Sequence, residues 1–302
     1  MSLKHFLKKS RLKYDARGVS ALPGIAADFT ISAVRKMPRV NRFGTNVYEK
    51  DWDVLVILDA CRTDLYRETI NPDAGEIWSV GSSSEEWMDN TFRDVDPSGT
   101  AYVTGNVFSR DHLDAADFHR IDEVWEYAWD DDRGTIPPRP LTDRAIDVRR
   151  NDDAERMIVH YMQPHFPFIG SEETFSRMYR GKFGEDGEIN PKNVWTRLRM
   201  NEVSTDELWA AYRDTLEFVF EEVELLMNNV DGLVAVTADH GNAVGEWGIY
   251  GHPRGLQVPP VRKVPWDTYE CTDSGEYTPD TRERGTVTDD EVQERLEHLG
   301  YA

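Results

Sequence analysis

The sequence predicts an α/β fold: a doubly wound, mostly parallel sheet sandwiched by helices. Residues 52–59 form a continuous apolar run that ends in an acid, which is typical of a central strand buried on both faces. Four further runs rich in Val, Ile and aromatic residues follow along the chain. Segments with helical periodicity separate these runs, and strands that alternate with helices build parallel sheets that are covered on both sides.

The elements expected after the first strand follow from local patterns. The further apolar runs predict strands over 77–80, 101–104, 155–162 and 232–238. Helical spacing and capping residues predict helices over 84–92, 141–150 and 204–229. The third of these helices starts with Ser204 and Glu207 at capping-box spacing and carries one apolar stripe, which indicates a helix packed on the core.

Two polar regions interrupt this pattern. Residues 171–203 predict a polar, helical excursion over the end of the sheet. Residues 266–288 are rich in Asp, Glu, Thr, Pro and Gly, which favours a solvated loop before a short helix over 289–299.

The composition excludes several classes of protein. The chain has 302 residues, a mean hydropathy of −0.62 and no apolar run long enough to span a membrane. It opens with no apolar segment followed by a small-residue cleavage site, so we expect no secretion by a standard signal peptide. Its two cysteines cannot form a disulfide scaffold, which fits a reducing interior. We therefore expect a cytoplasmic protein.

The net charge of −21 is unevenly distributed. Residues 1–45 hold ten Lys or Arg and two acids, so a basic N-terminal arm precedes an acidic main domain over 46–302. The acidic, lysine-poor main domain resembles proteins of salt-loving archaea, whose carboxylates keep the surface hydrated. This charge argues against a nucleic-acid partner, because phosphate backbones require a basic surface.

Two interpretations of the basic arm stay open. The arm could be a flexible or packed extension of the domain. Alternatively, it could form a helix on an anionic membrane surface, where each clustered Lys or Arg contributes about 1 kcal/mol. The second interpretation predicts peripheral contact with the inner face of the membrane.

Polar side chains follow several predicted strands, where ligands gather in open α/β sheets. Asp59 ends the first strand, and Asp239 and His240 follow the strand over 232–238. Two carboxylates and one imidazole suit a borderline divalent metal such as Zn²⁺ or Mn²⁺, while Ca²⁺ and Mg²⁺ stay open. The sequence therefore predicts a site for a divalent metal, and we expect one ion.

A serine triplet opens the helix predicted over 84–92. Backbone N–H groups at a helix N-terminus stabilise a developing alkoxide and an incoming anion, and a nearby metal would lower the pKa of the hydroxyl. His165 and His252 could stabilise a transferring oxyanion or protonate a leaving group. This combination predicts displacement at phosphorus or sulfur.

The segment from Asp239 to His252, Asp-His-Gly followed by Gly-Glu and Gly-Ile-Tyr-Gly-His, resembles the late metal motif of the sulfatase-like branch of the alkaline phosphatase superfamily. Its step of twelve residues from His240 to His252 is similar to that of the phosphoethanolamine transferases in that branch. Residues 160–167 resemble a His-Pro segment of sulfatases, and 295–301 resemble a common sulfatase C-terminus. The resemblance spans about residues 52–301.

The resemblance implies a catalytic domain over 46–302. The metal ligands that it implies are Asp59, Asp239, His240 and the nucleophile Ser84, with Ser82 and Ser83 as alternative nucleophiles. Neither the segment at Cys61 nor that at Ser84 matches the Cys/Ser-x-Pro/Ala-x-Arg motif of true sulfatases, so we do not expect formylglycine. We expect Cys61 to be a small buried residue.

The remaining implied groups face an anionic ester substrate. His165 and His252 are expected to be catalytic, or to form a weak second metal site. His160 is expected to contact the bound oxyanion, although a histidine within an apolar strand is by itself more often a core residue. Arg62 either clamps the oxyanion or pairs with an acid.

These residues predict a metal-dependent hydrolase of phosphate or sulfate esters that acts through a covalent seryl intermediate. Two alternatives stay open. One is transfer of a phospho- or sulfo-group to a lipid or glycan, and the other is a binding protein that retains the scaffold without catalysis.

Overall fold

The computed structural model of the 302-residue chain describes residues 43–170, 194–281 and 288–299, with positions 7, 10, 11, 14 and 18–21 before them. Most of the predicted basic arm over 1–45 therefore lies outside the described residues, and its boundary at residue 45 stays a prediction. Most of the predicted excursion over 171–203 also lies outside them, except for α8 (Val194–Arg199) at its end.

A seven-stranded sheet forms the centre of the protein, with the strand order β2-β9-β6-β1-β5-β3-β4. Strands β6, β1, β5, β3 and β4 are parallel, while β9 is antiparallel to both β2 and β6. The strands are β1 (Val54–Leu58), β2 (Gly75–Trp78), β3 (Thr100–Thr104), β4 (Arg120–Glu123), β5 (Arg156–Tyr161), β6 (Gly232–Thr237) and β9 (Lys263–Cys271). The predicted α/β fold with a mostly parallel sheet is confirmed.

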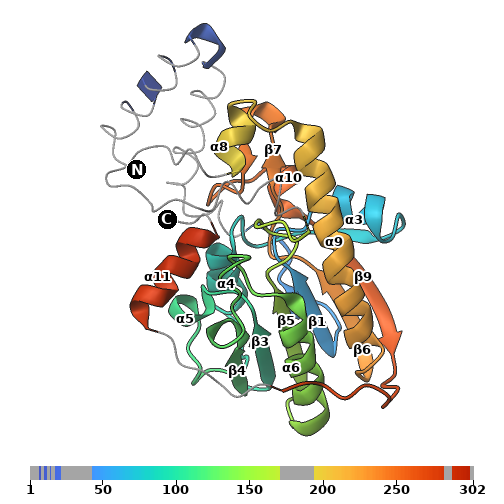
Figure 1. The fold of residues 1–302 in the computed structure, drawn as a ribbon. Helices are drawn as coiled ribbons and strands as arrows, with labels where there is room; N and C mark the ends of the chain where they lie inside the picture. Colours follow the sequence, from blue (N-terminus) through green and yellow to red (C-terminus); the bar gives the residue numbers. More distant parts are fainter. Residues whose placement is uncertain are drawn as a thin grey trace.

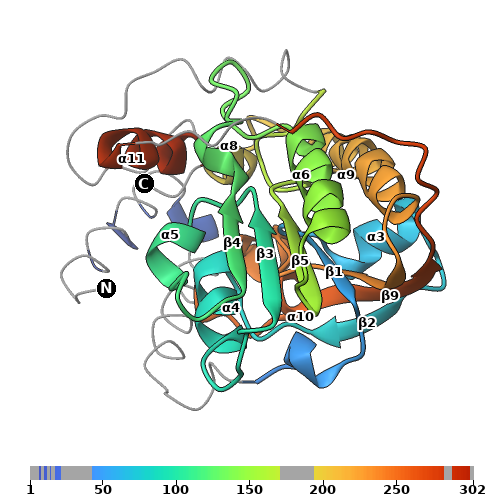
Figure 2. The same ribbon diagram turned by 90° about the horizontal axis from the view of Figure 1, so that it is seen from below.

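Helices cover both faces of this sheet. Figure 2 shows α6 (Pro138–Asn151) and α9 (Thr205–Met227) on one side, with α4 (Ser84–Thr91) and α10 (Pro259–Arg262) on the other. The other described helices are α3 (Thr63–Thr69), α5 (Ser109–His112) and α11 (Asp289–His298). No helix among the described residues combines the length and the apolar character needed to cross a membrane.

The alternation of side chains in β1 explains why this strand is apolar throughout. Val54, Val56 and Leu58 pack into the cluster that contains the buried residues of α6 and α9. Leu55 and Ile57 point the other way and join the cluster that includes Trp87 of α4. Because both faces are buried, every position of the strand requires an apolar side chain.

The elements predicted around the core agree with the structure within a few residues. Strands β1, β2, β3, β5 and β6 lie at the predicted places, and so do α4, α6 and α9. The capping box at the start of α9 is present, with the Ser204 side chain accepting from the Glu207 backbone and the Glu207 carboxylate accepting from Ser204 in return. The predicted C-terminal helix is α11.

The prediction of a loop over 266–288 was wrong in its first part, because β9 continues to Cys271. The N-terminal half of β9 pairs with β2, and its C-terminal half pairs with β6. Most side chains after Pro265 are only partly buried or exposed, so the strand shows little apolar alternation. Backbone pairing, rather than side-chain burial, holds this segment in the sheet.

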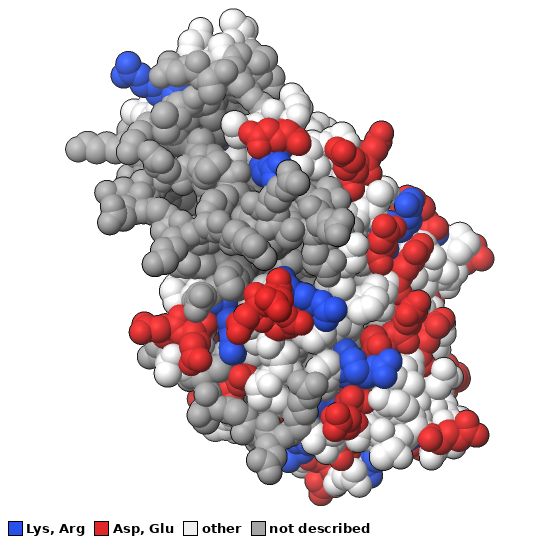
Figure 3. Space-filling model, viewed as in Figure 1, with Lys and Arg blue, Asp and Glu red and all other residues white. Residues whose placement is uncertain are grey.

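The polypeptide that follows β6 forms a small appendage beyond one end of the main sheet (Figure 1). It contains the two-stranded hairpin of β7 (Ala243–Val244) and β8 (Tyr250–Gly251), followed by α10. Figure 3 shows Asp and Glu side chains spread over the face viewed there, with Lys and Arg side chains among them.

Candidate metal centre and serine

Two carboxylates lie side by side where adjacent parallel strands end. Asp59 directly follows β1, Asp239 comes two residues after the end of β6, and both are fully buried. Asp239 Oδ1 accepts hydrogen bonds from the backbone N–H groups of Ala60, at 3.0 Å, and His240, at 2.8 Å. These bonds fix the orientation of Asp239 and leave its Oδ2 directed towards Asp59 and two histidines.

His160 reaches the same centre from β5. It pairs in register with Ile57 on one side and Thr104 on the other, and its ring packs edge-on against Trp87 on the α4 side of the sheet. The hydroxyl of Tyr102 lies 2.7 Å from Nδ1. This contact directs Nε2 towards the carboxylates, 3.7 Å from Asp239 Oδ2 and 3.9 Å from Asp59 Oδ2.

His240 completes a group of four polar atoms that face one another. Its Nε2 lies 3.5 Å from Asp59 Oδ1 and 3.5 Å from Asp239 Oδ2. These three atoms and Nε2 of His160 are buried, and none has a hydrogen-bond partner among the described residues. Asp59, His160 and Asp239 each place a ligand atom within 4.8 Å of the other two, and His240 Nε2 approaches both carboxylates from beside them. Buried polar groups are nearly always satisfied, so these atoms indicate a missing ligand.

The group fits a divalent cation. Ligands at 2.0–2.2 Å from a tetrahedral zinc ion lie about 3.4 Å from one another, and Asp239 Oδ2 lies 3.7 Å from His160 Nε2 and 3.5 Å from His240 Nε2. Two carboxylate oxygens and two imidazole nitrogens suit a borderline metal. Asp59, Asp239 and His240 were predicted as ligands, and the structure brings them together; His160, predicted to contact the oxyanion, faces the same point.

Burial in this centre, together with the neighbouring ionisable groups, shifts the pKa values of its side chains. Burial, and then the neighbouring Asp239 carboxylate, raise the pKa of Asp59 well above its ordinary value. Burial lowers the pKa of His160 to about 4, and burial together with the nearby His165 lowers that of His240 well below its ordinary value. Neutral imidazoles are the form that binds a metal, and a bound cation would favour the ionised Asp59.

The three serines at the start of α4 make different contacts. Ser83 is the N-cap, and its Oγ accepts from the Glu86 backbone at 3.4 Å. The Ser82 hydroxyl donates to the Glu86 carboxylate at 2.6 Å. Only the hydroxyl of Ser84, the first residue of the helix, bonds to the carboxylate centre, donating to Asp59 Oδ2 at 3.2 Å. The contacts of this triplet thus single out Ser84.

Asn106 is a site residue that the sequence analysis missed. It lies two residues after β3, is fully buried, and its Nδ2 donates to Asp59 Oδ2 at 2.8 Å. Ser84 and Asn106 therefore hold the same oxygen of Asp59, while the other oxygen faces His240. Its position after a strand was the available signal, because the ends of parallel strands meet at one edge of the sheet.

His165 and His252 form a pair beside this centre. Their Nε2 atoms lie 3.2 Å apart, and the His252 ring stacks on His240 with ring centres 4.2 Å apart. Burial lowers the pKa of His165 to about 4. Burial, followed by the proximity of His240 and His165, lowers the pKa of His252 well below its ordinary value. The two predicted catalytic histidines are therefore adjacent and lie against a predicted metal ligand.

Arg62 lies at the start of α3, where its guanidinium is paired with acids. It bonds to both oxygens of Asp64, at 2.8 and 2.6 Å, and to Glu246 at 2.7 Å, and it stacks 5.0 Å above the Trp209 ring. Pairing with acids was one of the two expectations for Arg62, and contact with an oxyanion stays a prediction. Cys61 beside it is fully buried, as expected.

Neither a protein-family model nor a curated protein matches the sequence. Solved structures do resemble the fold. The soluble domain of lipooligosaccharide phosphoethanolamine transferase A from Neisseria meningitidis is 14% identical, with a TM-score of 0.48, over 70% of this chain and 75% of that chain. The periplasmic domain of a phosphoethanolamine transferase from Campylobacter jejuni is also 14% identical, with a TM-score of 0.45, over 82% of each chain.

A third similar structure is an alkaline phosphatase superfamily protein from Vibrio parahaemolyticus. It is 12% identical, with a TM-score of 0.40, over 85% of this chain and 70% of that chain. At these identities and TM-scores the three structures show a likeness of fold and assign no activity to this chain.

Proposed function

We propose that this protein is a metal-dependent enzyme that cleaves phosphate or sulfate esters through Ser84. One observation carries the proposal: buried, unsatisfied ligand atoms of Asp59, Asp239, His160 and His240 lie beside two adjacent carboxylates, and the Ser84 hydroxyl bonds to one of these carboxylates. Asp59, Asp239, His160 and His240 would hold the cation. When bound, it would supply positive charge to stabilise an alkoxide and an oxyanion.

Water and the protein's own groups account for the proton transfers of a two-step reaction. In the first step, Ser84 Oγ bonds to phosphorus or sulfur, the bond to the leaving oxygen breaks, and the serine proton passes to Asp59 Oδ2. The leaving oxygen takes its proton from water, because the buried His165–His252 pair is neutral. In the second step, water or an acceptor hydroxyl displaces Ser84 Oγ and passes its proton through that pair to solvent, while Asp59 returns its proton to the serine.

The test compares Ser84→Ala with Ser83→Ala. Both variants are assayed on nitrophenyl phosphate and sulfate with Zn²⁺, Mn²⁺, Ca²⁺ and Mg²⁺, and intact-mass spectrometry detects the seryl ester. We expect Ser84→Ala to lower kcat by about 10³-fold or more and to abolish the ester. Ser83→Ala loses a helix cap and should retain kcat within about tenfold. Unchanged activity of Ser84→Ala would exclude this serine as the nucleophile.

Transfer of the group to a lipid or glycan hydroxyl is the second candidate within the same chemistry. An added alcohol acceptor then raises turnover and appears esterified, whereas a pure hydrolase releases only free phosphate or sulfate. A binding protein without catalysis is the third candidate. It predicts that the purified protein holds no divalent metal and forms no seryl ester.

We also propose a cytoplasmic location in a high-salt interior, which is supported by the net charge of −21 and the scarcity of lysine. The basic residues of the arm over 1–45 support peripheral contact with an anionic membrane. Flotation with anionic liposomes, with and without residues 1–45, tests this contact, and equal behaviour of the two forms would contradict it.

A further inference from the structure

The carboxylate of Glu86 joins two loops that are distant in the sequence. Glu86 is the third residue of α4 and is 4% exposed. Its Oε2 accepts from the Ser82 backbone at 2.8 Å, from the Ser82 hydroxyl at 2.6 Å and from the Gly255 backbone at 3.3 Å. A glutamate at this position of a helix ordinarily bonds to its own N-cap backbone, but here it reaches past the cap.

Ser82 extends this bridge. Its hydroxyl donates to Glu86 and accepts from the Leu256 backbone at 3.2 Å. The loop that begins after His252 is thereby attached to the loop that precedes Ser84. One carboxylate and one hydroxyl hold together two segments about 170 residues apart.

Three features make the bridge rigid. A carboxylate acceptor forms hydrogen bonds roughly twice as strong as a neutral one. The buried guanidinium of Arg262 lies close enough to interact electrostatically with Glu86. A Cβ at Gly81 would lie 2.3 Å from the Trp87 backbone nitrogen, so the serine loop lies in close contact with α4. Each loop therefore has little freedom to shift against the other.

We propose that Glu86 is a positioning residue that acts through Ser82 to fix His252 relative to Ser84. Ser84 lies two residues from each of the two residues that form the bridge, Ser82 and Glu86. His252 lies three residues before Gly255, where the other loop is attached. The proposal rests on the proposed function for the roles of Ser84 and His252. Glu86 itself does not contact the reacting atoms.

The experiment measures Ser82→Ala, Glu86→Gln and Glu86→Ala against Ser83→Ala as the matched control. A displacement of about 1 Å can cost about 10²-fold in rate, so we expect kcat to fall about 10- to 100-fold in Ser82→Ala and Glu86→Ala, with KM within about threefold. Glu86→Gln keeps an acceptor oxygen and should retain more activity than Glu86→Ala. Metal affinity should stay within about twofold.

Amide hydrogen exchange gives a readout that is independent of activity. The N–H groups of Gly255 and Leu256 should exchange about tenfold faster in Ser82→Ala and Glu86→Ala, because their acceptors are lost or released. In Ser83→Ala their exchange should not change, although the start of α4 is weakened. If Glu86→Ala does not fold, Ser82→Ala decides the outcome.

Three results would overturn this proposal. One is unchanged exchange at residues 255 and 256 in Ser82→Ala, and the other is faster exchange there with an unchanged kcat. An equal loss of kcat in Ser83→Ala would also contradict it, since that change removes a bond to the Glu86 backbone but leaves the Glu86 carboxylate and the Ser82 hydroxyl of the bridge in place. A wild-type protein that is inactive on all esters and forms no seryl ester would instead contradict the proposed function.

Discussion

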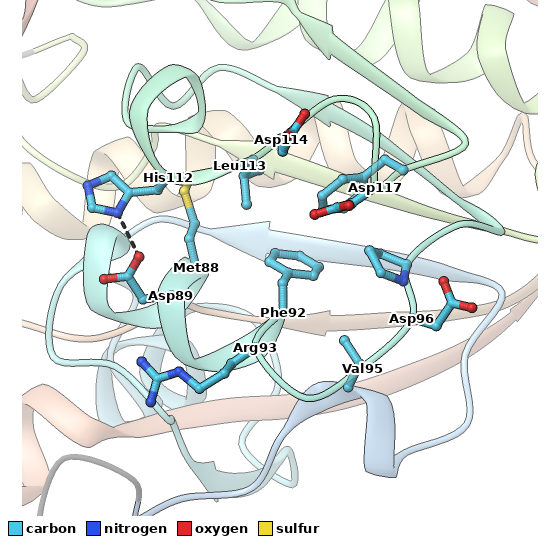
Figure 4. Close-up of a pocket in the computed structure, with 12 residues that line it drawn as sticks. Met88, Asp89, Phe92, Arg93, Val95, Asp96, His112, Leu113, Asp114 and Asp117 are labelled. Atoms are coloured by element: carbon cyan, nitrogen blue, oxygen red, sulfur yellow. Dashed lines mark hydrogen bonds and ion pairs between the residues drawn. The ribbon is translucent and has the colours of Figure 1, made fainter. Parts of the chain in front are cut away.

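Helix α4 has a polar region at each end, and the two regions differ in how their charged groups meet water. At its N-terminal end, Ser84 lies against a centre in which Asp59, Asp239, His160 and His240 are all fully buried. At its C-terminal end, a hollow of about 550 Å³ opens to the surface, and Figure 4 shows its lining side chains. None of the predicted site residues lines this hollow.

The hollow is lined by four aspartates, whereas the buried centre has two, yet the acids of the hollow have partners or face solvent. Asp89 pairs with His112 at 2.8 Å and with Arg254 at 3.1 Å. Asp96 and Asp114 are exposed and accept backbone hydrogen bonds at 3.0 Å from Ser98 and Ala116. The comparison shows that burial without a partner, rather than the number of carboxylates, distinguishes a ligand site from a solvated acidic surface.

The largest expected effect comes from removing one carboxylate of the buried centre. Asp239→Asn should lower the affinity for a divalent metal by at least about 100-fold, because it removes one anionic ligand and one negative charge. The matched change in the hollow, Asp117→Asn, should leave the affinity within about twofold. Isothermal titration with Zn²⁺ and Mn²⁺ measures both. Equal losses of metal affinity in Asp239→Asn and Asp117→Asn would show that burial does not distinguish the centre from the hollow as a metal site.

A smaller effect is expected from Tyr102, which contacts the proposed ligand His160. Tyr102→Phe removes the hydroxyl that contacts His160 Nδ1, and the loss of such an orienting contact costs about 10- to 100-fold in metal affinity. The same titration measures it. Tyr48→Phe removes a tyrosine hydroxyl that bonds to Thr100 instead, so its affinity should match that of the wild type. An unchanged affinity in Tyr102→Phe would mean that His160 is not a ligand.

The effect expected to be smallest for each step of one pH unit is that of pH on metal affinity. In the metal-free protein the raised pKa of Asp59 keeps its carboxyl protonated above the usual range, and a metal must displace this proton. The affinity should therefore rise with pH below that raised pKa, by at most about tenfold per unit for one proton, and level off above it. His160, with a pKa of about 4, is already neutral above pH 5. Titrations between pH 5 and 8 in two buffers measure the protons released, and an affinity that falls with pH would contradict this account.

The rules for strand ends predicted the core of the site, and tertiary contacts decided the rest. Asp59 and Asp239 could be found because both follow apolar strands whose carboxyl ends meet at one edge of the sheet. The direction in which the His160 side chain points could not be predicted from the sequence, because it depends on the strand register and on the contact with the Tyr102 hydroxyl. The three serines differ in the partner that each hydroxyl meets, and the partner of Ser84, Asp59, lies on a different strand end.

The strand β9 shows the corresponding limit for the fold. Its two halves pair with different neighbours, so neither half needs the apolar alternation by which strands are recognised in a sequence. Glu86 was visible as part of a helix start, but its bond to Gly255 depends on a loop about 170 residues later. A hydrogen bond between residues so far apart produces no local sequence pattern from which it could be predicted.

The strand order also sets when the centre can form during folding. The hydrogen bond from the Ala60 backbone to Asp239 joins residues 179 positions apart, and His160 comes from a third strand between them in the sequence. Contacts of such long range form late, after the loops between them have closed. A cation therefore meets its full set of ligands only in a chain whose central sheet is already complete. Metal binding would accordingly take place at the end of folding and would not direct its early steps.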